Sequence, residues 1–243
     1  MNNEKNIVIL TGAGMSAESG VPTFRGADGL WEGHHIEMVA SPEGFARDPE
    51  LVHRFYNLRR AALNTVKPNA GHLALARLER EWEGKFLLVT QNVDDLHERA
   101  GSEKLIHMHG ELLKARCECC NAVLFWSKEM SSGTRCRACG EIGGMRPHIV
   151  WFGEMPFELE KITTALHSAD IFLCIGTSGV VYPAAGFTRE AARNPACRLV
   201  EFNIESTEIS RQFRERVIGP VATELPRFVE QLLADDHRQA WLE

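Results

Sequence analysis

Apolar runs and helical patterns alternate along the whole chain. Continuous apolar runs bounded by polar turns predict strands that are buried on both faces, as in a parallel sheet covered by helices. They occur at residues 6–10, 85–90, 105–109, 148–152, 170–176 and 197–203. Apolar residues three or four apart predict helices, because these positions share one helix face. Such segments occur at residues 50–64, 68–82, 93–101, 156–168, 183–193 and 226–234.

Individual residues indicate where some of these elements begin, end and face the core. Asn69 is a typical N-cap residue, and Gly101 is typical of the end of a helix. Residues 21–48 are rich in Gly, Pro and polar residues without a clear period, which predicts an ordered loop with short helices. The two helices before residue 83 have these apolar positions at helical spacing: Leu51, Phe55, Leu58 and Leu63 on the first, and Leu73, Leu75, Leu78 and Trp82 on the second.

Strands that alternate with helices predict right-handed βαβ units and a doubly wound parallel sheet. Ligands of such sheets bind at the carboxyl ends of the strands. Polar segments follow predicted strands at residues 11–14, 90–94, 109–110, 176–178 and 203–205. We therefore expect all of these segments to lie at one edge of the sheet and to form the binding site.

The segment Thr11–Arg25 follows the first strand and contains G-x-G-x-x-A from Gly12 to Ala17. Glycines let a backbone approach a diphosphate, and a helix N-terminus adds N–H donors. The simpler alternative is a tight strand-to-helix turn. The next strand starts only near Lys85, and no acidic residue lies about 20 residues on, where a dehydrogenase would hold the ribose. The segment therefore predicts a dinucleotide site that is not built for hydride transfer.

The chain has seven cysteines, and four of them form two C-x-x-C pairs separated by fifteen residues. These four are Cys117, Cys120, Cys136 and Cys139. This spacing is typical of a closed four-thiolate zinc site with a structural role. Reactive or merely buried thiols are the alternative. Cys119 is an extra thiol that does not fit the spacing, and the odd, clustered count argues against a set of disulfides.

Two histidines lie on the predicted strand 105–109, and two short polar residues follow the predicted strand 85–90. His107 and His109 are two residues apart on one strand, so they share a face, and either could act as a general base near neutral pH. Asn92 and Asp94 could bind an amide or a ribose. The alternative for Asp94 is that it caps the helix that follows.

Tyr56 and Arg59 are three residues apart on a predicted helix, so they are neighbours on its surface. A phenol and a guanidinium together could bind a carboxylate, since Arg can do so with two parallel hydrogen bonds. A solvated helix face is the alternative interpretation.

The composition limits the partners. The 243 residues are 44% hydrophobic and 25% charged, with a net charge of −6. They can form one large domain, alone or with a small companion. The net negative charge offers no general attraction to nucleic acid or to an anionic membrane. The first apolar run is too short for a secretory signal or a spanning helix, so we expect a cytoplasmic protein without membrane or direct nucleic-acid partners.

Taken together and in order, these motifs resemble the sirtuin family, the NAD-dependent protein-lysine deacylases. The matching segments are TGAGMSAESGVPTFRG, TQNVDDLH, HMHG, the double C-x-x-C, IVWFGE, GTS and NIE, between about residue 5 and residue 230. The chain is most similar to bacterial members that remove acidic acyl groups as well as acetyl. The resemblance implies a Rossmann-like domain (1–26, 84–111 and 147–243), a helical insertion (27–83) and a zinc-ribbon module (112–146).

The resemblance also implies roles for residues at matching positions. His109 would be the base, with Asn92 and Asp94 beside the reacting bond, and Tyr56 and Arg59 would read the carboxylate of succinyl-lysine. Residues Val150, Trp151, Phe152, Gly153 and Glu154 would pair with the substrate backbone as an added strand. The implied NAD contacts are Gly12, Ala13, Gly14, Ser16, Ala17, Glu18, Thr23, Phe24, Arg25, Trp31, Gln91, Asn92, Val93, Asp94, His109, Gly176, Thr177, Ser178, Asn203, Ile204, Glu205 and Val221.

The implied reaction transfers an acetyl, succinyl or malonyl group from a protein lysine to the ribose of NAD, which is consumed as a co-substrate. The products would be nicotinamide, free lysine and 2′-O-acyl-ADP-ribose, and zinc would be structural. We expect a monomer that acts on acylated lysines of other proteins. Protein ADP-ribosyl transfer, an NAD-dependent dehydrogenase and a zinc-ribbon adaptor are the alternatives.

Overall fold

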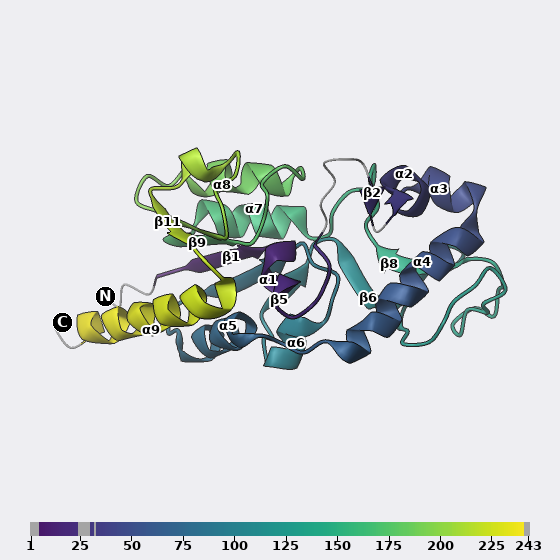
Figure 1. The fold of residues 1–243 in the computed structure, drawn as a ribbon, viewed down its shortest axis with the longest axis horizontal. Coiled ribbons are helices and arrows are strands. Elements are labelled where there is room, and N and C mark those ends of the chain that lie inside the picture. The colour runs from purple at the N-terminus through teal and green to yellow at the C-terminus, as the bar shows by residue number, and fades with distance from the viewer. Residues whose placement is uncertain (1–4, 24–29, 32, 241–243) are drawn as a thin grey trace.

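The computed structural model describes residues 5–23, 30–31 and 33–240 (Figure 1). The predicted cofactor-binding residues Phe24 and Arg25 lie outside the described residues. The side chains of residues 30–31 and 236–240, including that of Trp31, also lie outside the described part.

The larger part of the protein is built on a six-stranded parallel sheet, as the alternation of strands and helices predicts. Its strand order is β11-β10-β9-β1-β4-β5. The strands are β1 (Ile7–Thr11), β4 (Phe86–Thr90), β5 (Leu105–His107), β9 (Ile171–Ile175), β10 (Arg198–Asn203) and β11 (Glu215–Ile218). From β1, in the middle of the sheet, the chain first adds β4 and β5 on one side. It then adds β9, β10 and β11 in turn on the other side of β1. The loops after β1 and β9 therefore flank the switch point, where such sheets bind ligands.

Alternate residues of the strands pack against helices on opposite faces of the sheet (Figure 1). Ile7 and Ile9 contribute to the core under α5 (Ala70–Glu81) and α9 (Val221–Ala240). Val8 and Leu10 face the core under α7 (Leu159–His167) and α8 (Phe187–Ala191). Because both faces are covered, β1, β4 and β9 are apolar at nearly every position, which is why the sequence shows them as unbroken runs.

A second lobe lies beside the sheet, to the right in Figure 1. It contains α2 (Ile36–Val39), α3 (Pro42–Arg47), α4 (Pro49–Ala62) and a three-stranded sheet of order β7-β6-β8. Its strands are β6 (Gly110–Cys117), β7 (Val123–Phe125) and β8 (Met145–Ile149). The remaining elements are α1 (Ala13–Ala17), β2 (Leu30–Trp31), β3 (His34–His35), η2 (Leu63–Thr65), α6 (Leu96–Ala100), η3 (Ala184–Gly186) and η4 (Ser210–Gln212).

The predicted strands and helices differ from the structure in three places. The apolar run at 148–152 is not a strand of the parallel sheet, because β8 ends at Ile149 and pairs antiparallel with β6. The edge strand β11 was missed, since its charged residues form no apolar run. The last helix begins at Val221 rather than Pro226, because buried Leu225 and Val229 continue one apolar stripe across the proline.

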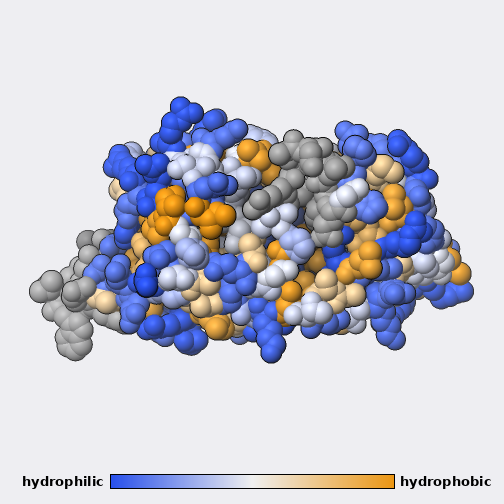
Figure 2. All heavy atoms as spheres, in the orientation of Figure 1, coloured by the Kyte–Doolittle hydropathy of each residue, from blue (hydrophilic) through white to orange (hydrophobic). Residues whose placement is uncertain are grey.

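The helix boundaries and faces were predicted with mixed success. Asn69 caps α5 through bonds to the N–H groups of the first turn, and Gly101 ends α6 with a left-handed φ of 105°, so both predictions are confirmed. Leu58 and Leu73 are two of the apolar positions of the helical pattern, but they lie off the buried face and are 72% and 54% exposed. Figure 2 shows apolar side chains among hydrophilic ones over α4. No helix of the described residues is long and apolar enough to cross a membrane.

Candidate active site

The polar segments that follow the strands meet at one edge of the parallel sheet, as predicted. Gly14 donates its N–H to the carbonyl of Gly176 at 2.8 Å, which joins the loops after β1 and β9. The Gln91 side-chain amide donates to the Thr177 hydroxyl at 3.0 Å, and the Asn203 amide donates to the Thr177 carbonyl at 3.0 Å. The loops after β1, β4, β9 and β10 therefore form one hydrogen-bonded rim.

The glycines of this rim are required by contact between its loops. A Cβ on Gly12 would lie 2.8 Å from the carbonyl oxygen of Gly176, and one on Gly14 would lie 2.7 Å from the Gly176 Cα. Gly176 itself has a left-handed φ of +61°. The N–H groups of Gly12 and Gly14 are also used within the chain, by Ile175 and Gly176. The glycines thus bring two backbones together, and a diphosphate would bind to other donors of this rim.

His109 has the hydrogen bonding of a neutral base. Its Nδ1 lies 3.2 Å from the carbonyl of Gln91, so that nitrogen carries the proton and Nε2 carries the lone pair. Burial lowers the pKa of His109, and the bond to Gln91 opposes this only in part. The imidazole is therefore neutral near pH 7, with Nε2 able to accept a proton.

His107 has different hydrogen-bond partners from His109. This difference distinguishes the two histidines, either of which could be the general base on sequence alone. Its Nδ1 donates to the carbonyl of Asn92 at 3.1 Å, and its Nε2 donates to the Glu98 carboxylate at 2.7 Å. Burial lowers the pKa of His107, but the bond to Glu98 and the charges of Glu98 and Glu111 outweigh it and raise the pKa. Because both nitrogens donate, His107 is charged and cannot serve as the base.

Asn92 and Asp94 connect the loop after β4 to the loop after β1. The Asn92 side-chain amide donates to the Ser16 hydroxyl at 3.0 Å. Asp94 is 5% exposed, and its carboxylate accepts the Leu96 N–H at 3.1 Å. Burial raises the pKa of Asp94, while bonds from Leu96 and Ser16 and the charge of His107 oppose that rise. The N-cap residue of α6 is Asp95 and not Asp94, but the Asp94 carboxylate binds the first N–H of the helix.

Two buried histidines, His72 and His97, contact α1 and the end of β1. The sequence analysis did not identify them. His72 lies 3.5 Å from the Ser16 hydroxyl, and His97 lies 3.0 Å from the Thr11 hydroxyl. Their ring centroids are 4.9 Å apart. Burial lowers the pKa of His72 to about 4 and that of His97 well below its ordinary value, so both are neutral. The one sequence signal was the place of His72 three residues after the Asn69 cap.

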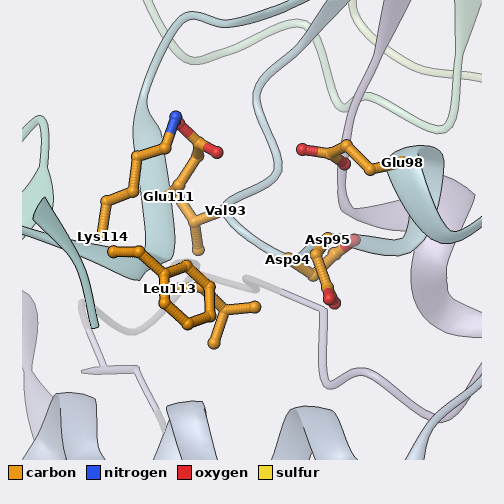
Figure 3. A pocket seen from close by; sticks show the side chains of 8 residues that line it. Val93, Asp94, Asp95, Glu98, Glu111, Leu113 and Lys114 are labelled. Carbon is orange, nitrogen blue, oxygen red and sulfur yellow. The ribbon is translucent and has the colours of Figure 1, made fainter. Parts of the chain in front are cut away.

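A small cavity of about 220 Å³ lies beside the 93–95 segment. Figure 3 shows the carboxylates of Glu98 and Glu111 facing each other across it, with Asp94 and Asp95 on the same side as Glu98. Lys114 is the one cation of its lining, and it is paired with Glu111 at 2.5 Å. Four carboxylates would repel a pyrophosphate, so this cavity does not suit the phosphates of a dinucleotide.

Tyr56 and Arg59 lie on α4, in the second lobe. The Tyr56 side chain is fully buried, and its hydroxyl accepts a hydrogen bond from the indole N–H of Trp151 at 3.0 Å. Burial raises the pKa of Tyr56, so the phenol stays protonated. The half-buried Arg59 guanidinium stacks on Phe55, 3.3 Å from the ring centroid, and donates to the Phe55 carbonyl. The motif therefore lies against the 150–154 segment, and one of its two residues lies in the core.

The 150–154 segment is tied to both lobes by its backbone. Val150 donates its N–H to the carbonyl of His109 at 2.9 Å, and Phe152 donates to the carbonyl of Ala40 at 2.9 Å. These donors are therefore not available to an added strand in this conformation, and a peptide would have to bond to other backbone groups of the segment. Its contact with a substrate stays a prediction.

The four predicted zinc ligands come together in the second lobe. The Sγ atoms of Cys117, Cys120, Cys136 and Cys139 all lie within 4.8 Å of one another. The Cys117–Cys139 and Cys120–Cys136 Sγ distances are both 3.8 Å. Zinc–sulfur bonds of about 2.3 Å give a tetrahedron whose edge is about 3.8 Å, so the cage fits Zn²⁺. Cys119 is exposed and lies outside this cluster.

The two C-x-x-C turns have the same backbone form. The residue after each pair has a positive φ, 59° at Asn121 and 82° at Gly140. Each of these residues donates its N–H to the carbonyl of the first cysteine of its pair, at 2.8 Å for Cys117 and 3.0 Å for Cys136. Asn and Gly are the residues that adopt this conformation most readily, which explains their presence here.

Several other predicted NAD contacts are placed at or near the rim. Ser178, Ile204 and Glu205 are exposed beyond the ends of β9 and β10. Glu18 accepts the Ala222 N–H at 2.9 Å, so it also caps α9. The side chain of Val221 is buried in the core at the start of the same helix. Their contacts with a cofactor stay predictions.

The fold and this site together define an α/β protein with a polar rim at the switch point of its sheet, a neutral histidine beside that rim and a four-cysteine cluster that fits zinc. The Sir2 family profile matches residues 12–183. The chain belongs to the Sir2 family.

Relatives and solved structures agree over nearly the whole chain. A Vibrio parahaemolyticus protein named NAD-dependent protein deacylase is 55% identical, over 96% of this chain and 97% of its own. An Escherichia coli K12 protein of the same name is 54% identical, over 93% and 82%. A Sir2 homolog–NAD complex superposes with a TM-score of 0.84 at 40% identity, over 95% of this chain and 91% of that one. A Sir2 structure bound to acetylated peptide gives 0.80 at 30% identity, over 95% and 94%.

Proposed function

We propose that this protein is an NAD-dependent protein-lysine deacylase that removes acetyl, succinyl and malonyl groups and releases nicotinamide and 2′-O-acyl-ADP-ribose. The observation that carries the proposal is the neutral His109, whose Nδ1 is bonded to the Gln91 carbonyl of the loop after β4, which leaves Nε2 unprotonated. The names of the relatives and the NAD and acetylated-peptide complexes of similar structures support it.

NAD supplies the glycosidic bond whose cleavage drives acyl transfer and consumes the dinucleotide. The glycine rim would hold the phosphates, and Asn92 and Asp94 would lie beside the nicotinamide. Both are buried and anchored through Ser16, so they are preorganised and lose little freedom on binding. His109 would accept a ribose hydroxyl proton at Nε2, and the Gln91 carbonyl would stabilise the imidazolium that forms.

The central test is incubation with NAD and peptides of one sequence that carry acetyl- or succinyl-lysine, with nicotinamide release and loss of the acyl group measured for each. We expect one nicotinamide per lysine released. Reduced cofactor without nicotinamide would indicate a dehydrogenase. Nicotinamide release with ADP-ribose left on protein would indicate an ADP-ribosyltransferase.

The pH dependence of kcat/KM should reflect the protonation of His109. Because burial lowers its pKa, the neutral base persists below the ordinary histidine value of about 6.5. We expect kcat/KM to stay level from about pH 8 down to that value and to fall at lower pH, as Nε2 becomes protonated. An inflection above about pH 7 would contradict a depressed pKa. The profile is measured with acetyl-peptide, whose acyl group does not titrate.

We propose that Tyr56 and Arg59 select acidic acyl groups. A buried, protonated phenol and a guanidinium one helix turn away are donors that a succinyl carboxylate can accept. A fully exposed arginine would bind a carboxylate only weakly, because water screens the ion pair. The Arg59 guanidinium is half-buried and stacks on Phe55, so it is less screened.

We expect Arg59→Met to lower kcat/KM for succinyl-peptide by about 10- to 100-fold, since a hydrogen bond to a charged partner contributes about 1.5–3 kcal/mol. Acetyl-peptide offers no carboxylate and should lose much less. Arg54→Met, on an exposed position of the same helix, is the matched control. An equal loss on both substrates would show that Arg59 is structural.

We further propose that the protein acts as a cytoplasmic monomer on acylated proteins. The division into a Rossmann-like domain, an insertion at 27–83 and a zinc module at 112–146 also stays a proposal.

A further inference from the structure

Tyr56 is connected by a buried hydrogen bond to the segment proposed to bind the peptide. Its hydroxyl lies 3.0 Å from the indole nitrogen of Trp151, and both side chains are almost completely buried. An indole N–H can only donate, so the phenol oxygen is the acceptor in this bond. The phenol's own hydrogen is therefore directed away from Trp151, and the bond restricts rotation of the hydroxyl.

Trp151 is in turn fixed by an ion pair. The guanidinium of Arg146 stacks on its ring, 3.4 Å from the centroid. Glu154 binds Arg146 with both carboxylate oxygens, at 2.7 and 3.0 Å, and also accepts the Trp151 backbone N–H at 2.8 Å. Arg146 is 2% exposed and the Glu154 side chain is 23% exposed, so the pair is partly shielded from solvent. Glu154 thus holds both the backbone and the ring of Trp151.

We propose that Trp151 is a positioning residue that orients the Tyr56 hydroxyl toward the acyl group, and that Arg146 and Glu154 couple acyl selection to the 150–154 segment. The inference rests on the proposed role of Tyr56 in acyl selection. Trp151 and Glu154 belong to the same five residues that are expected to contact the substrate backbone. A peptide that displaces this segment therefore changes the donor that the acyl group meets.

The direct test is a double-mutant cycle of Trp151→Phe and Tyr56→Phe. Phe keeps an aromatic ring but removes the indole N–H in one case and the hydroxyl in the other. We measure kcat/KM for succinyl- and acetyl-peptides of one sequence and compare their ratio. We expect Trp151→Phe to lower the succinyl-to-acetyl ratio by about three- to tenfold, as the loss of one hydrogen bond does.

The cycle should be non-additive, because both substitutions act through one hydroxyl. The double variant should have the ratio of Tyr56→Phe alone. Effects that multiply, or an unchanged ratio in Trp151→Phe, would overturn the inference. If Tyr56→Phe shifts the ratio and Trp151→Phe does not, only the positioning role fails. If Tyr56→Phe leaves the ratio unchanged, the proposed role of Tyr56 in acyl selection fails as well.

Trp82→Phe is the matched control, because Trp82 is also buried and donates its indole N–H, to the Lys5 carbonyl at 2.8 Å, but packs in the core under the sheet. Its ratio should not change. If Trp151→Phe does not fold, Glu154→Gln provides a second route, since it keeps the shape of the side chain and weakens the hold on Arg146. A lowered ratio in Glu154→Gln supports the coupling, and an unchanged ratio overturns it.

Discussion

Replacement of His109 by Ala should reduce turnover by about 10²- to 10⁴-fold, the typical contribution of a well-placed general base. The structure gives the reason, because His109 is neutral and its Nδ1 is committed to Gln91, so that Nε2 accepts the proton. NAD binding should persist, since the rim is held by bonds that do not involve this side chain. The measurements are kcat with acetyl-peptide and NAD affinity by calorimetry.

His107→Asn is the informative comparison for this experiment. His107 is two residues away on the same stretch, but both of its nitrogens donate, to Asn92 and to Glu98. Its loss should make the loop after β4, where His107 binds the Asn92 carbonyl, less well positioned. We expect a higher KM for NAD and a much smaller effect on kcat than that of His109→Ala. Unchanged turnover in His109→Ala, or a larger kcat loss in His107→Asn, would contradict the assignment of the base.

The parallel sheet and its rim could be predicted because their causes are local. A strand covered on both faces must be apolar along its length, as in β1, β4 and β9, and such runs are visible in one sequence. The glycines and polar residues that follow the strands then fall at one edge, because parallel strands share a direction. The cysteine spacing is equally local, and the four thiols lie together as expected.

Partners far apart along the chain could not be predicted in this way. The apolar run of 148–152 has the composition of a sheet strand, and only its pairing with β6 shows that it belongs elsewhere. The same is true of Arg146, whose ion pair with Glu154 supports Trp151, and of His72 and His97 under the rim. A buried polar side chain gives no periodic signal that distinguishes it from an exposed one. The resemblance supplied roles for Trp151 and Glu154, but not the contacts that connect them to Tyr56.

Loss of zinc should unfold the second lobe and stop catalysis. Structural zinc contributes about 10–16 kcal/mol in zinc-finger peptides, as much as the whole stability of a typical domain. The module around the thiolates has a small core, which includes Trp126, Met130 and Met145. Its strands lead directly to the site, since β6 starts beside His109 and β8 ends beside Val150, whose N–H bonds the His109 carbonyl. Unfolding of the module should therefore displace His109, the proposed base.

Cys136→Ser tests this, because Cys136 is a buried ligand in the cage. We expect the variant to lose more than about 100-fold in zinc affinity and, with it, deacylation and the cooperative unfolding of the second lobe. Cys119→Ser is the matched control, since Cys119 lies between two ligands but is exposed and outside the cluster. It should retain one zinc per chain and its activity. Zinc loss in Cys119→Ser, or full activity in zinc-free Cys136→Ser, would contradict a closed structural cage made by the four predicted thiolates.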